Sequence, residues 1–124
     1  MDAKRTALLA QGGYYALTGV APFVSRKAFE AVTGPKREWW LVQTVGALVT
    51  AVGAGLLSAA ARDRATPEVV GIAAGSAAGL AGIDVAYVLR GRISPVYLGD
   101  AGVQIALLAA LAASRREADQ THET

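Results

Sequence analysis

Four long stretches that are nearly free of charged residues restrict the fold of this chain more than any other feature of its sequence. They predict membrane-spanning helices, because a helix needs about 20 mainly apolar residues to cross the hydrocarbon core of a bilayer. The expected spans are residues 6–25, 39–61, 67–89 and 95–114. Short loops between them predict an all-α fold, an integral membrane antiparallel four-helix bundle that forms one domain, residues 1–124. We expect the charged tail, 115–124, to fray.

The alternative is a water-soluble helical bundle, in which each helix needs a polar stripe for solvent. The segment 41–61 offers only Gln43, Thr44, Thr50 and Ser58 for such a stripe. Soluble domains carry about 25% charged residues, whereas this chain carries 18% and has a mean hydropathy of +0.36. Composition therefore favours the membrane. A cleaved signal peptide is a poor alternative for 6–25, because Gln11 and two glycines split its apolar part.

Several residues mark where the predicted helices begin. Thr66 and Ser94 each precede a proline, which is the arrangement of a helix N-cap followed by proline at the first helical position. Trp39 and Trp40 are an interfacial anchor at the start of the second span. Residues 25–33 fit either a short interfacial helix or an ordered loop, and the sequence leaves both open.

The distribution of basic residues does not orient the chain in a membrane. Four spans place both termini on one side, and each side of the predicted topology then carries six lysines and arginines. The positive-inside rule therefore gives no direction, and cytoplasmic termini are only a default. A tie is also what a protein inserted in both orientations would show, but we attribute it to chance. The many alanines and glycines suggest a bacterium with a GC-rich genome, and thus the bacterial inner membrane.

The composition excludes several kinds of chemistry. The chain has no Cys and a single His, His122, which lies in the polar tail. Disulfides, thiol catalysis and zinc sites of the usual kind are therefore excluded, and we expect no metal and no cofactor. The net charge is only +2 and the basic residues are scattered, so nucleic acid is not an expected partner.

Two aspartates inside predicted spans are the most informative polar residues. Each costs about 2.5–3.5 kcal/mol on insertion scales at the centre of a membrane helix. Asp84 lies eight residues before Arg92, at the centre of the loop, and Asp100 lies eight after it. An antiparallel hairpin thus brings them to similar depth. Tyr87 and Tyr97 are each three residues from an aspartate, and hence on the same helix face.

Other spans place polar residues in the same half of the predicted bundle, while the opposite half is almost entirely apolar. The pattern predicts a one-sided polar pocket, which a small ligand or lipid would occupy. Two other interpretations fit the same residues equally well. The polar groups can serve only to hold the helices together by hydrogen bonds, or Arg90 or Arg92 can turn back and neutralise an aspartate. The predicted pocket residues are Asp84, Asp100, Tyr87, Tyr97, Gln43, Gln104, Thr18 and Tyr15.

Glycine spacing and loop charges predict two further surfaces. Glycines at intervals of four let another helix backbone approach closely, and the third span carries Gly71, Gly75, Gly79 and Gly82. We expect these to pack inside the bundle, with a homodimer seam as the alternative. The interfacial basic residues are ordinary headgroup-level charges or a site for anionic lipid, and they are Lys36, Arg37, Arg90 and Arg92.

The motifs of two segments resemble a family of small four-span bacterial membrane proteins with no assigned activity. The first segment runs from Phe29 to Lys36 and continues with Trp40-Leu41-Val42; the second carries Asp84, Tyr87 and Tyr97. The resemblance covers nearly the whole chain and implies a fold but no activity. The chain is also similar in size and span number to the small multidrug-resistance transporters. Their essential glutamate lies in the first span, which contains no acid here, so their function is not carried over.

Three functions remain open from the sequence. The first is a non-enzymatic membrane protein whose polar pocket binds a small ligand or lipid. The second is an oligomeric small transporter or channel subunit that uses Asp84 or Asp100 as its coupling acid. The third is a membrane enzyme with the Asp–Tyr pairs as acid and base, which ranks last because the sequence offers no nucleophile or metal set.

Overall fold

The chain folds as α-helices joined by short loops. The structure, a computed structural model, describes residues 3–34, 36 and 38–123, and the side chains among them as far as residue 114. Within this part of the chain there is no strand. The helices are α1 (Ala3–Val24), α2 (Arg26–Thr33), α3 (Trp39–Ala61), α4 (Pro67–Leu89) and α5 (Tyr97–Glu123). The all-α class predicted from the sequence is confirmed.

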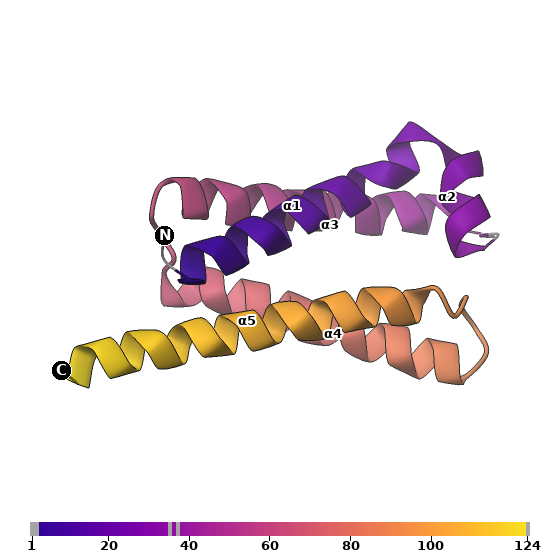
Figure 1. The fold of residues 1–124 in the computed structure, drawn as a ribbon. Helices are drawn as coiled ribbons and strands as arrows, with labels where there is room; N and C mark the ends of the chain where they lie inside the picture. The colour runs from indigo at the N-terminus through magenta and orange to yellow at the C-terminus, as the bar shows by residue number, and fades with distance from the viewer. Residues whose placement is uncertain (1–2, 35, 37, 124) are drawn as a thin grey trace.

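The four long helices lie as two antiparallel pairs (Figure 1). The most extensive contact is between α1 and α3, and the next is between α4 and α5. The pairs meet mainly through α1 and α5, while α3 and α4 barely touch. Helix α1 begins and α5 ends at one end of the molecule, called here the terminal end. Helix α2 and the α4–α5 loop lie at the other, called here the loop end.

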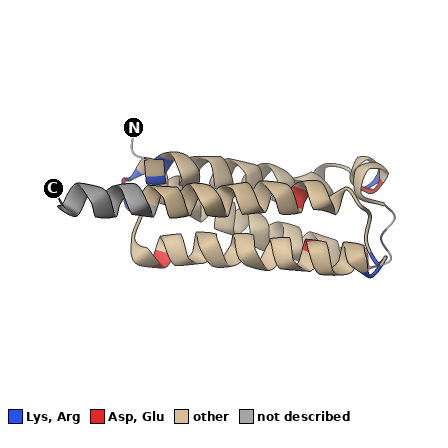
Figure 2. Ribbon diagram, turned by 60° about the horizontal axis from the view of Figure 1, so that its bottom comes forward, with Lys and Arg blue, Asp and Glu red and all other residues tan. Residues whose placement is uncertain are grey.

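Three of the helices are long and apolar enough to cross a membrane. They are Trp39–Ala61, Pro67–Leu89 and Tyr97–Ser114, and they occupy the second, third and fourth predicted spans. Helix α1 is long enough, but Gln11 and Thr18 are among the polar residues that lower its hydropathy. Lysines and arginines lie towards the ends of the helices, as Figure 2 shows. Length and composition are thus those of a multi-pass membrane protein.

Local hydrogen bonds set the beginnings of α4 and α5. The Thr66 hydroxyl accepts a hydrogen bond from the Val69 N–H at 3.3 Å, and Pro67 follows it, so the predicted N-cap is confirmed. Helix α5 begins two residues after the predicted position, at Tyr97. A turn precedes it, in which the Tyr97 N–H donates to the Ser94 carbonyl at 3.1 Å.

Residues 26–33 form a helix rather than an ordered loop. The Ser25 hydroxyl accepts a hydrogen bond from the Ala28 N–H at 3.1 Å. Gly34 ends the helix with a φ of 92°, which glycine adopts without steric cost. The Glu30 carboxylate accepts hydrogen bonds from the Lys36 N–H at 2.6 Å and from Arg26 at 3.0 Å. These two donors, Lys36 first, hold the pKa of Glu30 below its ordinary value.

Helix α5 continues into the charged tail. Helix α5 runs to Glu123, well beyond its apolar segment, which ends at Ser114. Alanine, arginine, glutamate and glutamine are strong helix formers, and they make up most of this segment. The backbone of α5 is thus helical as far as Glu123, and the fraying of the tail over 115–124 stays a prediction.

Two glycines on α1 and two on α3 bring the backbones of these helices into contact. A Cβ atom on Gly53 would lie 2.7 Å from the Ala16 nitrogen and 2.8 Å from the Gly12 carbonyl oxygen. A Cβ atom on Gly46 would lie 2.6 Å from the Gly19 carbonyl oxygen. Real Cβ atoms do not approach backbone this closely, so only glycine fits. The α1–α3 pair is therefore the tightly packed half of the molecule.

The glycines singled out in the sequence lie elsewhere. All four are exposed on the outer side of α4, and a Cβ atom on any of them would meet no other atom within 4 Å. The expected packing of these residues inside the chain is not observed, because α4 turns its buried alanines inward instead. Their part in a homodimer stays a prediction. The residues concerned are Gly71, Gly75, Gly79 and Gly82.

The apolar core lies toward the terminal end. Leu8 of α1 and Ala73 of α4 are fully buried, and Leu56, Ala60 and Leu111 are nearly so. All four long helices meet in this cluster. The terminal half is thus closed mainly by small and branched apolar side chains.

The α1–α3 contact gives a prediction for two glycines on one helix. We expect Gly53→Ala to lower the free energy of unfolding by about 1–3 kcal/mol, the usual cost of overpacking. Gly55→Ala should be neutral or stabilising, because its Cβ atom would lie in open space. Denaturant titration of both variants in detergent measures the difference, and equal stabilities would contradict the packing described here.

Candidate functional site

A cavity of about 1120 Å³ lies between the two helix pairs, toward the loop end. It exists because α3 and α4 barely touch there, while α1 stays close to both α3 and α5. All five helices contribute to its lining. Most of the wall is apolar, and it includes Pro22, Phe29, Val42, Val49, Leu80 and Val103. None of the described residues that line the cavity is basic.

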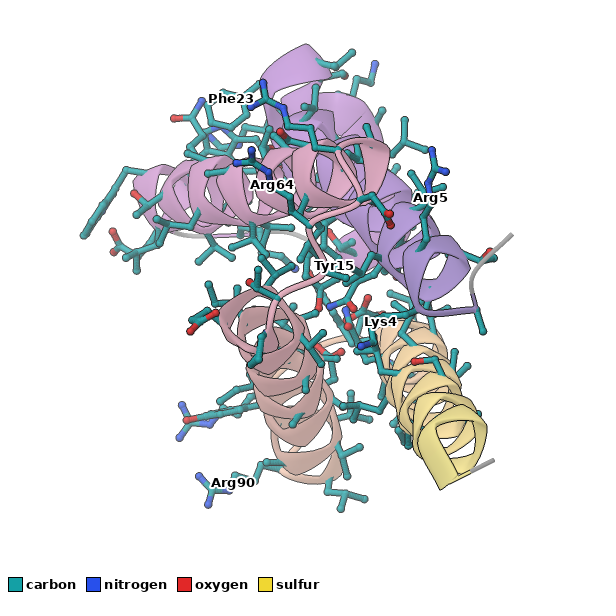
Figure 3. The ribbon with its side chains drawn as sticks, turned by 90° about the vertical axis from the view of Figure 1, so that its left-hand side faces the viewer. Lys4, Arg5, Tyr15, Phe23, Arg64 and Arg90 are labelled. Carbon is teal, nitrogen blue, oxygen red and sulfur yellow. The ribbon has the colours of Figure 1, made fainter. Side chains whose placement is uncertain are left out.

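Six of the eight predicted pocket residues line this cavity. They come from three helices that are distant in sequence, and they are Tyr15, Thr18, Asp84, Tyr97, Asp100 and Gln104. The structure thus brings the two aspartates together across the α4–α5 pair. Tyr15 lies centrally among the long helices, whereas Phe23 and Arg90 point outward (Figure 3).

Hydrogen bonds connect α1 to α5 through these side chains. The Tyr15 hydroxyl donates to Gln104 Oε1 at 2.7 Å, and both residues are almost fully buried. Gln104 Nε2 in turn donates to Asp100 Oδ1 at 3.3 Å. The Tyr14 hydroxyl donates to the same oxygen. Asp100 is therefore held in place by one donor from its own helix and one from α1.

Asp84 is held much less completely. Asp84 is 6% exposed, and the carboxyl group of Asp100 lies against it across the helix pair, close enough for a hydrogen bond when one of the two groups is protonated. The Oδ2 atom of Asp84 is buried without a hydrogen-bond partner among the described residues. A buried polar atom without a partner costs about 1–3 kcal/mol. Among the described lining residues, this oxygen is the buried side-chain atom that the protein leaves unsatisfied.

Two of the predicted pocket residues lie outside the cavity. Tyr87 is 37% exposed, and the Arg90 guanidinium lies 5.4 Å from its ring. Three residues along a helix correspond to a rotation about 60° short of a full turn, which suffices to turn Tyr87 outward from Asp84. Gln43 is half-buried, but α3 faces the cavity with Val42, Val45 and Gly46. These two assignments to the pocket do not hold in this structure.

The sequence reasoning missed two polar contacts of α1. Tyr14 is not among the predicted pocket residues, yet it lines the cavity and its hydroxyl donates to Asp100. Gln11 is fully buried, and its Nε2 atom donates to the Ala73 carbonyl oxygen at 2.8 Å, which ties α1 to α4. The available signal was that an acid inside a span needs a donor, and that α1 carries two tyrosines and a glutamine within its own predicted span.

The described members of the predicted basic set, Lys36, Arg90 and Arg92, lie at the loop end and form no ion pair with the aspartates. Lys36 donates from Nζ to the Thr33 carbonyl oxygen at 2.8 Å and lies 5.2 Å from the Tyr97 ring. With Arg92 it lines a smaller polar cavity of about 350 Å³ between the two loops. Arg90 lies over Tyr87 instead of Asp84. Arg37 lies outside the described residues.

No other chemistry is indicated in the part of the chain that the structure describes. Within it, no group of three or more His, Cys, Asp or Glu residues is placed to hold a metal ion.

The chain matches no protein-family model, no curated protein and no solved structure. A functional assignment therefore depends on the geometry of the cavity.

The hydrogen bond between Tyr15 and Gln104 gives a second prediction. Tyr15→Phe removes the donor and leaves Gln104 Oε1 buried without it, so we expect a loss of about 1–3 kcal/mol in unfolding free energy. Tyr87→Phe makes the same chemical change on an exposed ring and should have no measurable effect. Thermal unfolding of both variants in detergent tests this; an unchanged Tyr15→Phe protein would contradict the hydrogen bond.

Proposed function

We propose that this chain is a small integral membrane protein, an antiparallel four-helix bundle whose loop-end cavity binds a small amphipathic molecule. One observation supports the binding role above the others: a large apolar cavity contains a buried carboxylate oxygen without a partner. In this proposal the spans are approximately 6–25, 39–61, 67–89 and 95–114, with a charged segment at 115–124. The bacterial inner membrane is the proposed location.

The exposure pattern of α1 supports its assignment as a membrane span in addition to the three more apolar helices. Its polar side chains Gln11 and Tyr15 are buried, whereas Leu17 and Val24 are 77% and 76% exposed. Polar residues inside and apolar residues outside is the arrangement expected of a helix that faces lipid. Helix α1 is then a span whose modest hydropathy comes from the residues it contributes to the site.

The alternative interpretation, in which the polar residues only hold the helices together, fits less well. Hydrogen bonds made for helix association should satisfy their own donors and acceptors. Tyr15, Gln104 and Asp100 fulfil this expectation, whereas Asp84 Oδ2 does not. Gln11 Oε1 is also buried without a partner among the described residues, but Gln11 does not line the cavity. A ligand that contributes a hydrogen-bond donor would complete the set. We therefore favour a binding site over a purely structural network.

Native mass spectrometry of the protein released from a mild detergent tests the proposal. We expect a monomer that carries a reproducible additional mass, which would also identify the bound molecule. Val49→Trp should abolish this mass, because Val49 lines the cavity and the larger side chain would fill it.

The matched control is Leu48→Trp. Leu48 is the preceding residue of the same helix and is 64% exposed, so the new indole would point away from the cavity. This variant should retain the additional mass, and both proteins should melt near the wild-type temperature. Loss of the mass from neither variant, or its absence from the wild type, would contradict the proposal.

An oligomeric transporter or channel subunit is the second candidate. It is favoured by the outward stripe of α4, where Gly71, Gly75, Gly79 and Gly82 leave the helix backbone open to another chain. In that function, Asp84 or Asp100 would act as the coupling acid. A bare dimer or higher oligomer in the same spectra would favour this candidate over a monomeric binding protein.

A further inference from the structure

We propose that the cavity selects a lipophilic cation that carries N–H donors, and that Asp84 is the residue that receives its charged group. This proposal rests on the proposed binding function and goes further by naming the chemical class of the ligand. Three properties of the site support it: its charge, its hydrogen bonds and its shape.

The charge of the site is unbalanced toward the acidic side. Asp84 and Asp100 both line the cavity, whereas none of the described lining residues is a lysine, arginine or histidine. Among the described loop-end cations, Lys36 donates to the Thr33 carbonyl oxygen and Arg90 lies over Tyr87, and neither lines the cavity. Two carboxyl groups this close share a proton more readily than they carry two charges. A cationic ligand would stabilise the ionised form of the pair, whereas an anionic ligand would oppose it.

The hydrogen bonds assign the cation to Asp84 rather than to Asp100. Asp100 Oδ1 already accepts bonds from Tyr14 and Gln104. Asp84 Oδ2 accepts none from the described residues, although its residue is more than nine-tenths buried. A ligand that offers only acceptors would leave this oxygen unpaired. An ammonium group, in contrast, supplies charge and donors together, which makes the strongest kind of hydrogen bond.

The apolar walls of the cavity determine what the uncharged part of the ligand can be. At about 1120 Å³ the cavity is large, near the upper limit of roughly 300–1,000 Å³ for small-molecule sites. Its walls are mainly Val, Leu, Pro and Phe side chains. These walls accept an aliphatic ring system or an alkyl chain, and they offer few partners to a ligand with many polar groups. A compact apolar amine combines both properties.

Isothermal titration calorimetry with three matched probes tests the ligand class. The probes are 1-aminoadamantane, its alcohol 1-adamantanol and its N,N,N-trimethylammonium derivative, titrated into the purified protein with detergent-only titrations subtracted. We expect the amine to bind at least about tenfold tighter than the alcohol, because a charge-assisted hydrogen bond replaces a neutral one. The trimethylated cation, which has no N–H, should bind more weakly than the amine.

Two variants locate the selectivity. Asp84→Asn removes the charge with little change of shape, so the preference for the amine over the alcohol should disappear while the alcohol still binds. Glu68→Gln makes the same change at the exposed first turn of α4, remote from the cavity, and should leave the preference intact. The three-probe comparison on the wild type does not depend on the folding of any variant.

The outcomes separate this inference from the proposed function. Equal affinity for amine and alcohol, or a preference that survives in Asp84→Asn, would overturn the cationic class while the binding site remains. Equal affinity for the amine and its trimethylated derivative would overturn the requirement for N–H donors. Binding of all three probes that persists unchanged in Val49→Trp would instead place them outside the cavity and contradict the proposed function itself.

Discussion

Polar groups in an apolar chain must find their partners within the protein, and this constraint organises the loop-end half of the molecule. An acid inside a membrane helix is expensive unless a donor reaches it. Here Tyr14 and Gln104 reach Asp100, and Tyr15 reaches Gln104, so α1 is bound to α5 by side chains far apart in sequence. Helix α1 thereby becomes the centre of the fold, although it is less apolar than α3 and α4.

The helices pack differently in the two halves of the molecule. At the terminal end, alanines and leucines of all four long helices close on one another. At the loop end, the glycine contacts keep α3 against α1, which draws it away from α4 and leaves the cavity between the pairs. The same close approach that stabilises one helix pair thus produces the space in which a ligand would lie. Asp84 faces that space without a partner of its own.

Sequence periodicity was sufficient for the helices and for the approach of Asp84 to Asp100. The spacing of Asp84 and Asp100 about Arg92 correctly brought the two acids to one level, because a hairpin of regular helices has little freedom in depth. Rotation about a helix axis was harder: Tyr87 turns outward although it is only three residues from Asp84. The glycines of α4 could not be distinguished from those of α3, because spacing alone does not say which face meets a neighbour. Tyr14 was missed because its partner lies 86 residues away.

The most direct test is whether a water-soluble reagent reaches the side of α4 that faces the cavity. The protein has no cysteine, so single cysteines can be placed at Leu80, which lines the cavity, and at Ile83, which is 56% exposed on the outer side of the same helix. A cationic methanethiosulfonate reagent added to protein in nanodiscs should modify Leu80→Cys rapidly and Ile83→Cys slowly, since only a hydrated thiol ionises readily. Equally slow reaction at both positions would contradict a cavity open at the loop end.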